Sequence, residues 1–241
     1  MSFGRWRRGC ESRASNVRNV VVRGPTGSAY LLWIADIDNL RQYSALESMF
    51  RANPTARADL KSGTLYAISG EAHWIYYGQV TPDKRIGFFH RRDHELASPF
   101  EILSSQLMAV VGVAYPSITR ALRSGAWFKL GRFALADDLL MPLPMVQWPV
   151  GTLSVGVSDG THEYDTRVED PAIQNMEVMA VWDAEHHIPA RLTADFGQEE
   201  AAWHVGGPVW RARKVKEENA HRFPDAPWHK LPDDWVPTNG S

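Results

Sequence analysis

The sequence predicts an α+β fold that consists mostly of antiparallel β-sheet with a few short helices. Short β-rich runs recur along the chain, and turn residues rather than long helices separate most of them. The regular alternation of strands and helices that accompanies a doubly wound parallel sheet is missing. A chain of 241 residues is long enough to bury a sizeable core without disulfides or metal ions.

The first expected elements are a helix and a three-stranded meander. Asp38 can cap a helix whose apolar residues recur at spacings of three and four, and this helix should end near Asn53 and Pro54. Three β-rich runs with turn residues between them predict the meander. They are Thr64 to Ser69, His73 to Val80 and Arg85 to His90, with turns at Gly70 and Glu71 and at Thr81 to Lys84.

The second half of the chain predicts further strands and two more helices. The continuous apolar run from Gln106 to Ala114 is short enough for a buried strand. Ser117 can cap a short helix that runs to Arg123 and stops at Gly125. The remaining expected elements are a strand from Trp127 to Phe133, a hairpin of Gly151 to Val157 and His162 to Arg167 around Asp159 and Gly160, a strand from Val178 to Trp182, and a helix from Ala184 to Phe196 closed by Gly197. Trp127 and Trp182 lie inside β-rich runs and are expected in the core.

The sequence suggests three parts. Residues 1–28 are expected to be a flexible basic leader, and residues 29–203 a single α+β domain. Residues 204–241 form an extension rich in Pro and Trp, and the prolines at 224, 227, 232 and 237 oppose regular structure there. We expect this extension to pack on the domain through its large apolar aromatic residues, which gain by burial: Trp210, Phe223, Trp228 and Trp235.

Apolar runs and cysteine content indicate in which cellular compartment the protein is expected. The longest apolar stretch, Leu107 to Tyr115, is shorter than the about 18 residues that a membrane span needs. No apolar run of a secretory signal follows the start of the chain. Cys10 is the single cysteine, which excludes an intramolecular disulfide and a cysteine-based zinc cage. We therefore expect a cytoplasmic protein.

Charge is distributed unevenly. Six arginines lie among the first 30 residues with Glu11 as the one acid there. Removing these from the 26 basic and 28 acidic residues of the chain leaves residues 31–241 with a net charge of −7. An acidic body is a poor nucleic-acid binder and would attract a basic protein. Two other interpretations of the Arg-rich start stay open, an organelle transit peptide and a nucleic-acid-binding arm.

The enzyme-like motifs lack their structural context. Gly156 to Gly160 matches the G-x-S-x-G nucleophile elbow around Ser158, but the elbow joins a strand to a helix, and here a strand-like run follows. His90 and His94 have the spacing of a zincin, yet Arg91 occupies the place of its glutamate. No phosphate-binding glycine motif occurs. The sequence thus predicts no enzyme, no metal and no cofactor. A serine hydrolase that uses Ser158 remains an alternative.

The ten tryptophans leave a second alternative open, because exposed tryptophans can bind carbohydrates or peptides. Large aromatic residues are more often core residues or interface anchors. Retention of a glycan would favour the binding module, whereas loss of esterase activity in Ser158→Ala would favour the hydrolase.

Several segments together resemble the Immunity protein 26 family of bacterial polymorphic-toxin immunity proteins. They are KSGTLYAIS, YYGQV, ALRSGAWFKLGR, and AVWDAEHHIPARL followed by Trp203, so the resemblance spans about Lys61 to Trp203. It implies a mostly β fold with a few helices that acts by binding a cognate toxin rather than by catalysis. The family offers no catalytic residue set to transfer. The first 60 residues and the tail after Trp203 lie outside the resemblance.

The expected binding residues therefore follow from charge and exposure. If the toxin is a nuclease or deaminase, its active cleft is commonly basic because it must hold a polyanionic substrate. The acidic residues at turns or at exposed strand positions beside apolar neighbours are the expected contacts: Asp137, Asp138, Asp159, Glu163 and Asp165. The predicted partner is thus a toxin domain, with no nucleic acid and no membrane; the oligomeric state stays open.

Overall fold

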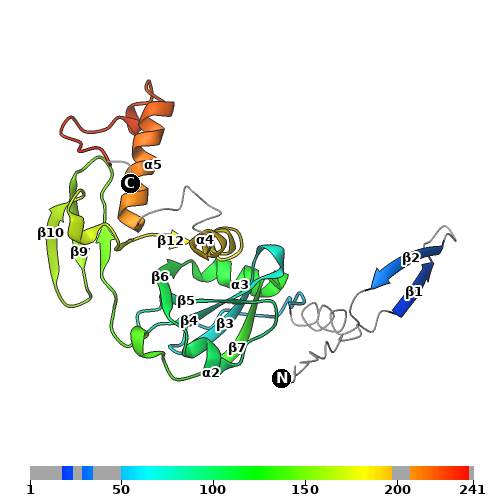
Figure 1. The fold of residues 1–241 in the computed structure, drawn as a ribbon. Helices are drawn as coiled ribbons and strands as arrows, with labels where there is room; N and C mark the ends of the chain where they lie inside the picture. Colours follow the sequence, from blue (N-terminus) through cyan, green and yellow to red (C-terminus); the bar gives the residue numbers. More distant parts are fainter. Residues whose placement is uncertain (1–17, 24–28, 35–49, 197–206, 239–241) are drawn as a thin grey trace, which may run out of the picture. The chain divides into compact units, whose positions relative to one another are not determined.

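The computed structural model describes residues 18–23, 29–34, 50–196 and 207–238 (Figure 1). The chain divides into two compact units, Met1–Ser48 and Met49–Ser241. In the first unit, β1 (Arg18–Arg23) and β2 (Ala29–Ile34) pair as antiparallel strands. β1 falls inside the expected flexible leader, where no strand was predicted. The helix expected from Asp38 lies mostly outside the described residues, and the boundaries at residues 28 and 203 stay predictions.

The second unit contains a six-stranded sheet that confirms the predicted α+β class. Its order is β12-β6-β5-β4-β3-β7, and every neighbouring pair is antiparallel except β12 with β6. The strands are β3 (Thr64–Ser69), β4 (Ile75–Val80), β5 (Ile86–Asp93), β6 (Leu107–Val113), β7 (Trp127–Arg132) and β12 (Val181–Trp182). The meander predicted from three β-rich runs is β3, β4 and β5.

Two helices cover one face of this sheet, as Figure 1 shows: α3 (Tyr115–Ser124) and α4 (His187–Phe196). Ile118, Leu122 and Ile188 from these helices pack against Tyr66 and Phe88 of the strands. Trp127 is buried among them, as expected, and its indole N–H donates to the Ala184 carbonyl at 2.9 Å. Trp182 is only half-buried, so it lies at the margin of this core rather than inside it.

On the other face lie α2 (Pro99–Leu103) and the segment that follows β7. Gln79 of β4 is fully buried and fixes this segment through both ends of its amide. Its Nε2 donates to the Ala134 carbonyl at 2.8 Å, and its Oε1 accepts from the Ala136 N–H at 3.0 Å. A short 3-10 helix, η2 (Asp137–Leu139), follows directly, so one buried side chain positions the loop that carries Asp137 and Asp138.

A second, four-stranded sheet has the order β10-β9-β8-β11. Its strands are β8 (Met145–Gln147), β9 (Ser154–Ser158), β10 (Glu163–Arg167) and β11 (Glu177–Val178), with β11 parallel to β8. The hairpin predicted around Asp159 and Gly160 is the β9–β10 hairpin. Val155 and Val157 of β9 point to a second core, which Val209 of α5 (Pro208–Arg222) completes.

The C-terminal segment folds back along α5. The Glu217 carboxylate accepts from the Trp235 indole N–H at 2.9 Å and from the Thr238 N–H and hydroxyl. Arg213 donates to the Val236 carbonyl at 2.8 Å. Trp235 packs against the second core. Trp228 is 77% exposed and Phe223 is also exposed, so these two of the four expected anchors are not buried against the domain.

Several details differ from the predicted elements, among them α2 and β8, which were not predicted. The helix predicted from Ser117 begins at Tyr115, since Pro116 fits the first turn, and the Ser117 hydroxyl donates back to the Ala114 carbonyl at 2.7 Å. The strand predicted from Val178 to Trp182 is two short strands, β11 and β12, that belong to different sheets. The longest helix of the described residues, α5, was not predicted.

Candidate interaction surface

The predicted contact residues lie on two neighbouring surface elements. Asp137 and Asp138 are exposed in η2, and Glu163 and Asp165 are exposed on β10. Asp159 is half-exposed in the turn between β9 and β10. The structure therefore places all five acids on two segments, the η2 loop and the β9–β10 hairpin.

A close contact joins these two segments. Gly160 has a φ of +88°, a left-handed conformation that glycine adopts at little cost. A Cβ atom at Gly160 would lie 2.8 Å from two ring atoms of Pro142, so the turn lies directly against the end of the η2 loop. The acids of the loop and those of the hairpin thus belong to one continuous surface.

Apolar side chains are exposed in the η2 loop, next to the proline that contacts the hairpin. Leu140 is 56% exposed and Met141 is 70% exposed, between the two aspartates of η2 and Pro142. Large apolar side chains with a charged border are typical of protein-binding sites, where the apolar centre supplies affinity and the rim supplies specificity. We define the contact surface as the η2 loop with its Leu140 and Met141, together with the β9–β10 hairpin.

Asp159 has a structural task within this surface. Its carboxylate accepts from the His162 N–H at 2.7 Å, and from the N–H and hydroxyl of Thr161 at 2.8 Å each. These hydrogen bonds, with that from His162 first, hold the pKa of Asp159 well below its usual range. A change at Asp159 would disturb the turn, so Glu163 and Asp165 are the cleaner positions for testing charge.

Ser158 is the last residue of β9, and the turn leads into a strand rather than a helix. Its hydroxyl accepts from the Gly160 N–H at 3.4 Å. This strand–turn–strand geometry lacks the strained strand-to-helix turn of a nucleophile elbow. The prediction of a hairpin turn at Asp159 and Gly160 is confirmed.

His90 and His94 are exposed residues that stack on aromatic rings. The His94 ring lies 3.6 Å from that of Trp74, and the His90 ring lies 4.6 Å from that of Phe196. The Arg92 guanidinium lies over both Trp74 and Phe196, at 4.5 and 5.2 Å from the ring centroids. Across residues 50–196 and 207–238 and the two N-terminal strands, no group of three or more potential metal ligands comes together.

A charged cavity between the two sheets was not predicted. It has a volume of about 1000 Å³. Arg191 lies at its wall, largely buried, ion-paired with Glu177 of β11 and with Asp195 at 3.2 Å, and stacked over Trp182 at 4.6 Å. Burial opposes the charge of Arg191, but the two carboxylates outweigh it and raise its pKa. In the sequence, the spacing of four residues between Arg191 and Asp195 could have indicated this ion pair, because residues four apart are neighbours on a helix.

This network holds parts of the protein together. Arg191 connects α4 with β11, and Arg211 of α5 lies 3.9 Å from the same Asp195. The carboxylates on the cavity wall are thus paired with arginines of the same wall. We assign the network a structural role.

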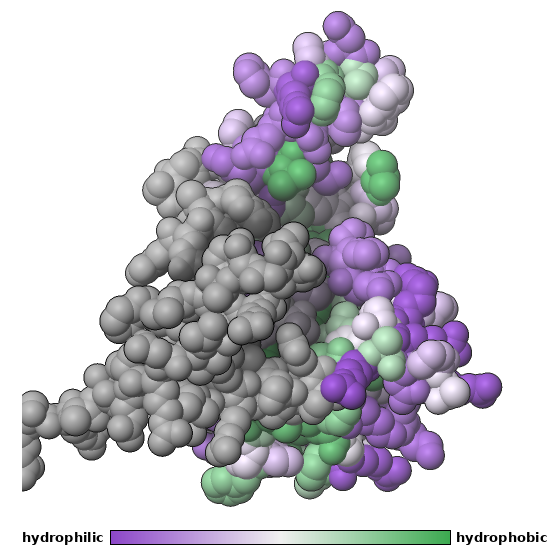
Figure 2. Space-filling view, turned by 90° about the vertical axis from the view of Figure 1, so that its right-hand side faces the viewer, coloured by the Kyte–Doolittle hydropathy of each residue, from purple (hydrophilic) through white to green (hydrophobic). Residues whose placement is uncertain are grey.

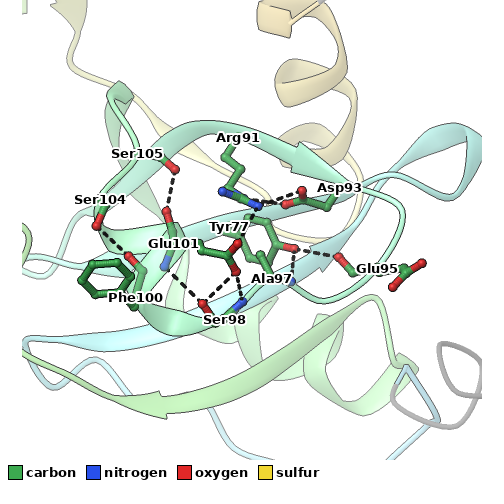
Figure 3. Close-up of polar contacts among 10 residues, drawn as sticks. All are labelled: Tyr77, Arg91, Asp93, Glu95, Ala97, Ser98, Phe100, Glu101, Ser104 and Ser105. Carbon is green, nitrogen blue, oxygen red and sulfur yellow. Dashed lines mark hydrogen bonds and ion pairs between the residues drawn. The ribbon is translucent and has the colours of Figure 1, made fainter.

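A third polar cluster surrounds α2 (Figure 3). The Tyr77 hydroxyl donates to the Glu95 carbonyl at 3.2 Å and accepts from the Ala97 N–H at 3.0 Å. Ser98 and Glu101 form a capping box at the start of α2. Burial is the main reason that the pKa of Tyr77 is raised. Figure 3 shows that Tyr77 of β4 holds the loop before α2, while the Arg91 guanidinium of β5 lies 3.9 Å from the Glu101 carboxylate of α2. These contacts indicate a structural cluster.

The faces of several tryptophans are covered by groups of the protein itself. Trp148 and Trp235 stack 6.2 Å apart with Lys216 over Trp148, and Trp74 lies beneath His94 and Arg92. Trp228 is largely exposed, but the stacked tryptophans do not form an open platform for sugars.

On the face drawn in Figure 2, the described residues are mainly hydrophilic and the apolar ones form a few small groups.

No described helix combines the length and the apolar character needed to cross a bilayer. Comparison with known proteins finds no matching family model, no matching curated protein and no matching solved structure.

Proposed function

We propose that the chain is an immunity protein that binds and neutralises a cognate bacterial toxin, a nuclease or deaminase with a basic cleft. The observation that carries this proposal is the contact surface, in which exposed Leu140 and Met141 lie between acidic residues of two segments that Gly160 and Pro142 hold together.

Charge supports the same proposal. Residues 31–241 carry a net charge of −7, and the carboxylates of the contact surface add to a field that attracts a basic partner. Rim charges of this kind mainly raise the association rate, and buried apolar residues slow dissociation. The segments between Lys61 and Trp203 resemble the Immunity protein 26 family and suggested this function from the sequence, although no family model matches the chain.

The proposal places the protein in the bacterial cytoplasm. There it would meet a toxin delivered by a neighbouring cell or one made by its own cell. The single cysteine suits that reducing compartment.

Co-expression with the toxin domain encoded by the adjacent gene tests the proposal. We expect the chain to restore growth and to bind the purified domain. Changing Met141→Asp should weaken binding at least tenfold, because a charge would replace an apolar contact. The pair Glu163→Lys and Asp165→Lys should slow association most strongly at low salt, where charges are least screened.

A matched control makes the same change of charge elsewhere. Glu218→Lys and Asp225→Lys alter two exposed acids outside the contact surface. These changes should slow association much less than the pair on β10 and should leave the dissociation rate as it is. If the control pair weakened binding as much as the pair on β10, the contact surface would be wrong. If the chain neither protected cells nor bound the toxin domain, the proposed function would be wrong.

A further inference from the structure

One edge of β10 is open. β10 is the outermost strand of its sheet and pairs only with β9 among the described strands. The Asp159 N–H donates to the His162 carbonyl at 3.2 Å, and the Val168 N–H donates to the Leu153 carbonyl at 2.9 Å. Along an antiparallel ladder, residue pairs that exchange hydrogen bonds alternate with pairs that do not. The two bonds at the ends of the β9–β10 ladder therefore determine which residue pairs between them are hydrogen-bonded.

The alternation assigns the direction of each backbone group. Tyr164 pairs with Val157 and Thr166 with Val155, and the N–H and C=O groups of these two β10 residues face β9. The backbone groups of Glu163, Asp165 and Arg167 face the opposite way. The Arg167 carbonyl accepts from the Asp170 N–H at 3.0 Å. Among the described residues, the open part of the edge therefore consists of the backbone groups of Glu163 and Asp165 and the Arg167 N–H.

The inner side of this edge is apolar and incompletely covered. Residues directly opposite each other in a sheet share a face, so Tyr164 lies on the same face as the buried Val157. Tyr164 is nevertheless 50% exposed. The apolar layer of the second core thus extends to the rim of the sheet, where a further strand would cover the ring.

The outer side of the edge selects the partner. Glu163 and Asp165 are exposed there, and the guanidinium of Arg167 is already paired with Glu169 and Asp234. A second copy of β10 would therefore place Asp165 opposite another Asp165 or opposite Glu163. Like charges on an edge strand oppose self-association, whereas basic side chains on an incoming strand would pair with them. The occupant that fits is an extended segment with basic residues on one face and an apolar residue on the other.

We infer that the toxin binds by adding a strand to β10. Its extended basic segment forms backbone hydrogen bonds with Glu163, Asp165 and Arg167, and an apolar side chain of the segment covers Tyr164. This inference rests on the proposed function, since it states how the partner of that function is held.

Hydrogen exchange of backbone amides, followed by NMR, tests the inference directly. The probe is a blocked seven-residue peptide of alternating lysine and valine, and its control replaces each lysine by glutamate. The amides of Glu163, Asp165 and Arg167 should exchange at least tenfold more slowly with the lysine peptide, and those of Tyr164 and Thr166 should change little. No added protection of the three outward amides would overturn the inference.

Two variants of Asp165 separate the contribution of its backbone N–H to binding from that of its carboxylate. Asp165→Ala and Asp165→Pro both remove the carboxylate, but only proline also removes the outward N–H. That N–H makes no bond to β9, so proline is tolerated there as on other edge strands. The proline variant should bind the lysine peptide and the toxin domain about fivefold to tenfold more weakly than the alanine variant.

The outcomes distinguish the two proposals. If the toxin domain binds both variants equally, strand addition is wrong while the proposed function stands. If the lysine peptide protects β10 but no toxin domain binds, the proposed function is wrong and β10 remains a site for basic extended segments. Circular dichroism of both variants checks that the fold is intact, and the exchange experiment needs only the unchanged chain.

Discussion

Gln79 is a single buried amide on which the position of a surface loop depends. Replacing it in Gln79→Leu would leave the Ala134 carbonyl and the Ala136 N–H without their hydrogen-bond partner. We expect a loss of about 1–3 kcal/mol in the free energy of unfolding, because buried polar groups without partners are costly. Urea denaturation measures this loss. The same substitution at the exposed Gln147 should change stability by less than about 0.5 kcal/mol.

Tyr66 gives a prediction about pH. Its hydroxyl donates to the Asp59 carbonyl at 2.8 Å and accepts from the Asp59 N–H at 2.8 Å. Burial raises the pKa of Tyr66 to about 12, against 10.0 for a free tyrosine. Folding therefore favours the neutral hydroxyl. Its contribution to stability is complete below about pH 10 and disappears as the pH rises towards 12.

Comparison with Tyr66→Phe isolates this effect. The variant cannot ionise at this position, so the difference in unfolding free energy between the two proteins should shrink between pH 10 and 12. Absorbance of the ionised phenol reports the titration directly. A constant difference across that range would contradict the prediction.

Among the elements, the C-terminal segment depends on one carboxylate. Burial alone would raise the pKa of Glu217, but the hydrogen bonds from Thr238 and Trp235 outweigh it and lower the pKa. The contact is therefore strongest when Glu217 is ionised. In Glu217→Ala the segment after Pro232 should leave α5 more often and be cleaved faster in limited proteolysis. Glu218→Ala, which changes an exposed neighbour, should be cleaved like the unchanged chain.

The elements also show what the sequence could predict. Strands β3 to β7 and the β9–β10 hairpin follow from local signals, namely β-rich runs bounded by turn residues such as Asp159 and Gly160. Helix α5 buries only Val209 and Arg213. Its sequence therefore lacks the apolar residues at spacings of three and four that predict an amphipathic helix. Pro208 could have indicated the start of this helix, because proline is common at the first helical position.

The contact surface was predictable only in part. Exposure of Asp137, Asp138, Glu163 and Asp165 follows from their places at turns and on alternating strand positions. The contact of Gly160 with Pro142 joins segments of different elements, and no local pattern in the sequence encodes it. The charged cavity was missed for the same reason, since Glu177 and Arg191 meet only after β11 has paired with β8.

At the scale of the whole second unit, Arg191 connects two cores. It stacks on Trp182 of the six-stranded sheet and pairs with Glu177 of the four-stranded sheet. Arg191→Ala would leave the largely buried Glu177 without its ion-pair partner, which should cost about 3–5 kcal/mol. Urea denaturation followed by tryptophan fluorescence measures the loss and shows whether the two cores still unfold together.

A matched control is Arg120→Ala. Arg120 also pairs with a carboxylate, that of Asp183 at 2.7 Å, but its side chain is more than half exposed. Exposed ion pairs contribute about 0–1 kcal/mol. Equal losses in the two variants would show that burial of the Arg191 pair does not matter.

The contact of Gly160 with Pro142 restricts how this protein can diverge. Surface loops usually accept insertions, whereas a turn position with positive φ, such as Gly160, favours glycine. Here a residue added between Asp138 and Pro142 would move the proline away from the turn, and a larger residue at position 160 would collide with it. Homologues should therefore vary these two positions together, so that a change of loop length in one segment is accompanied by a new turn in the other.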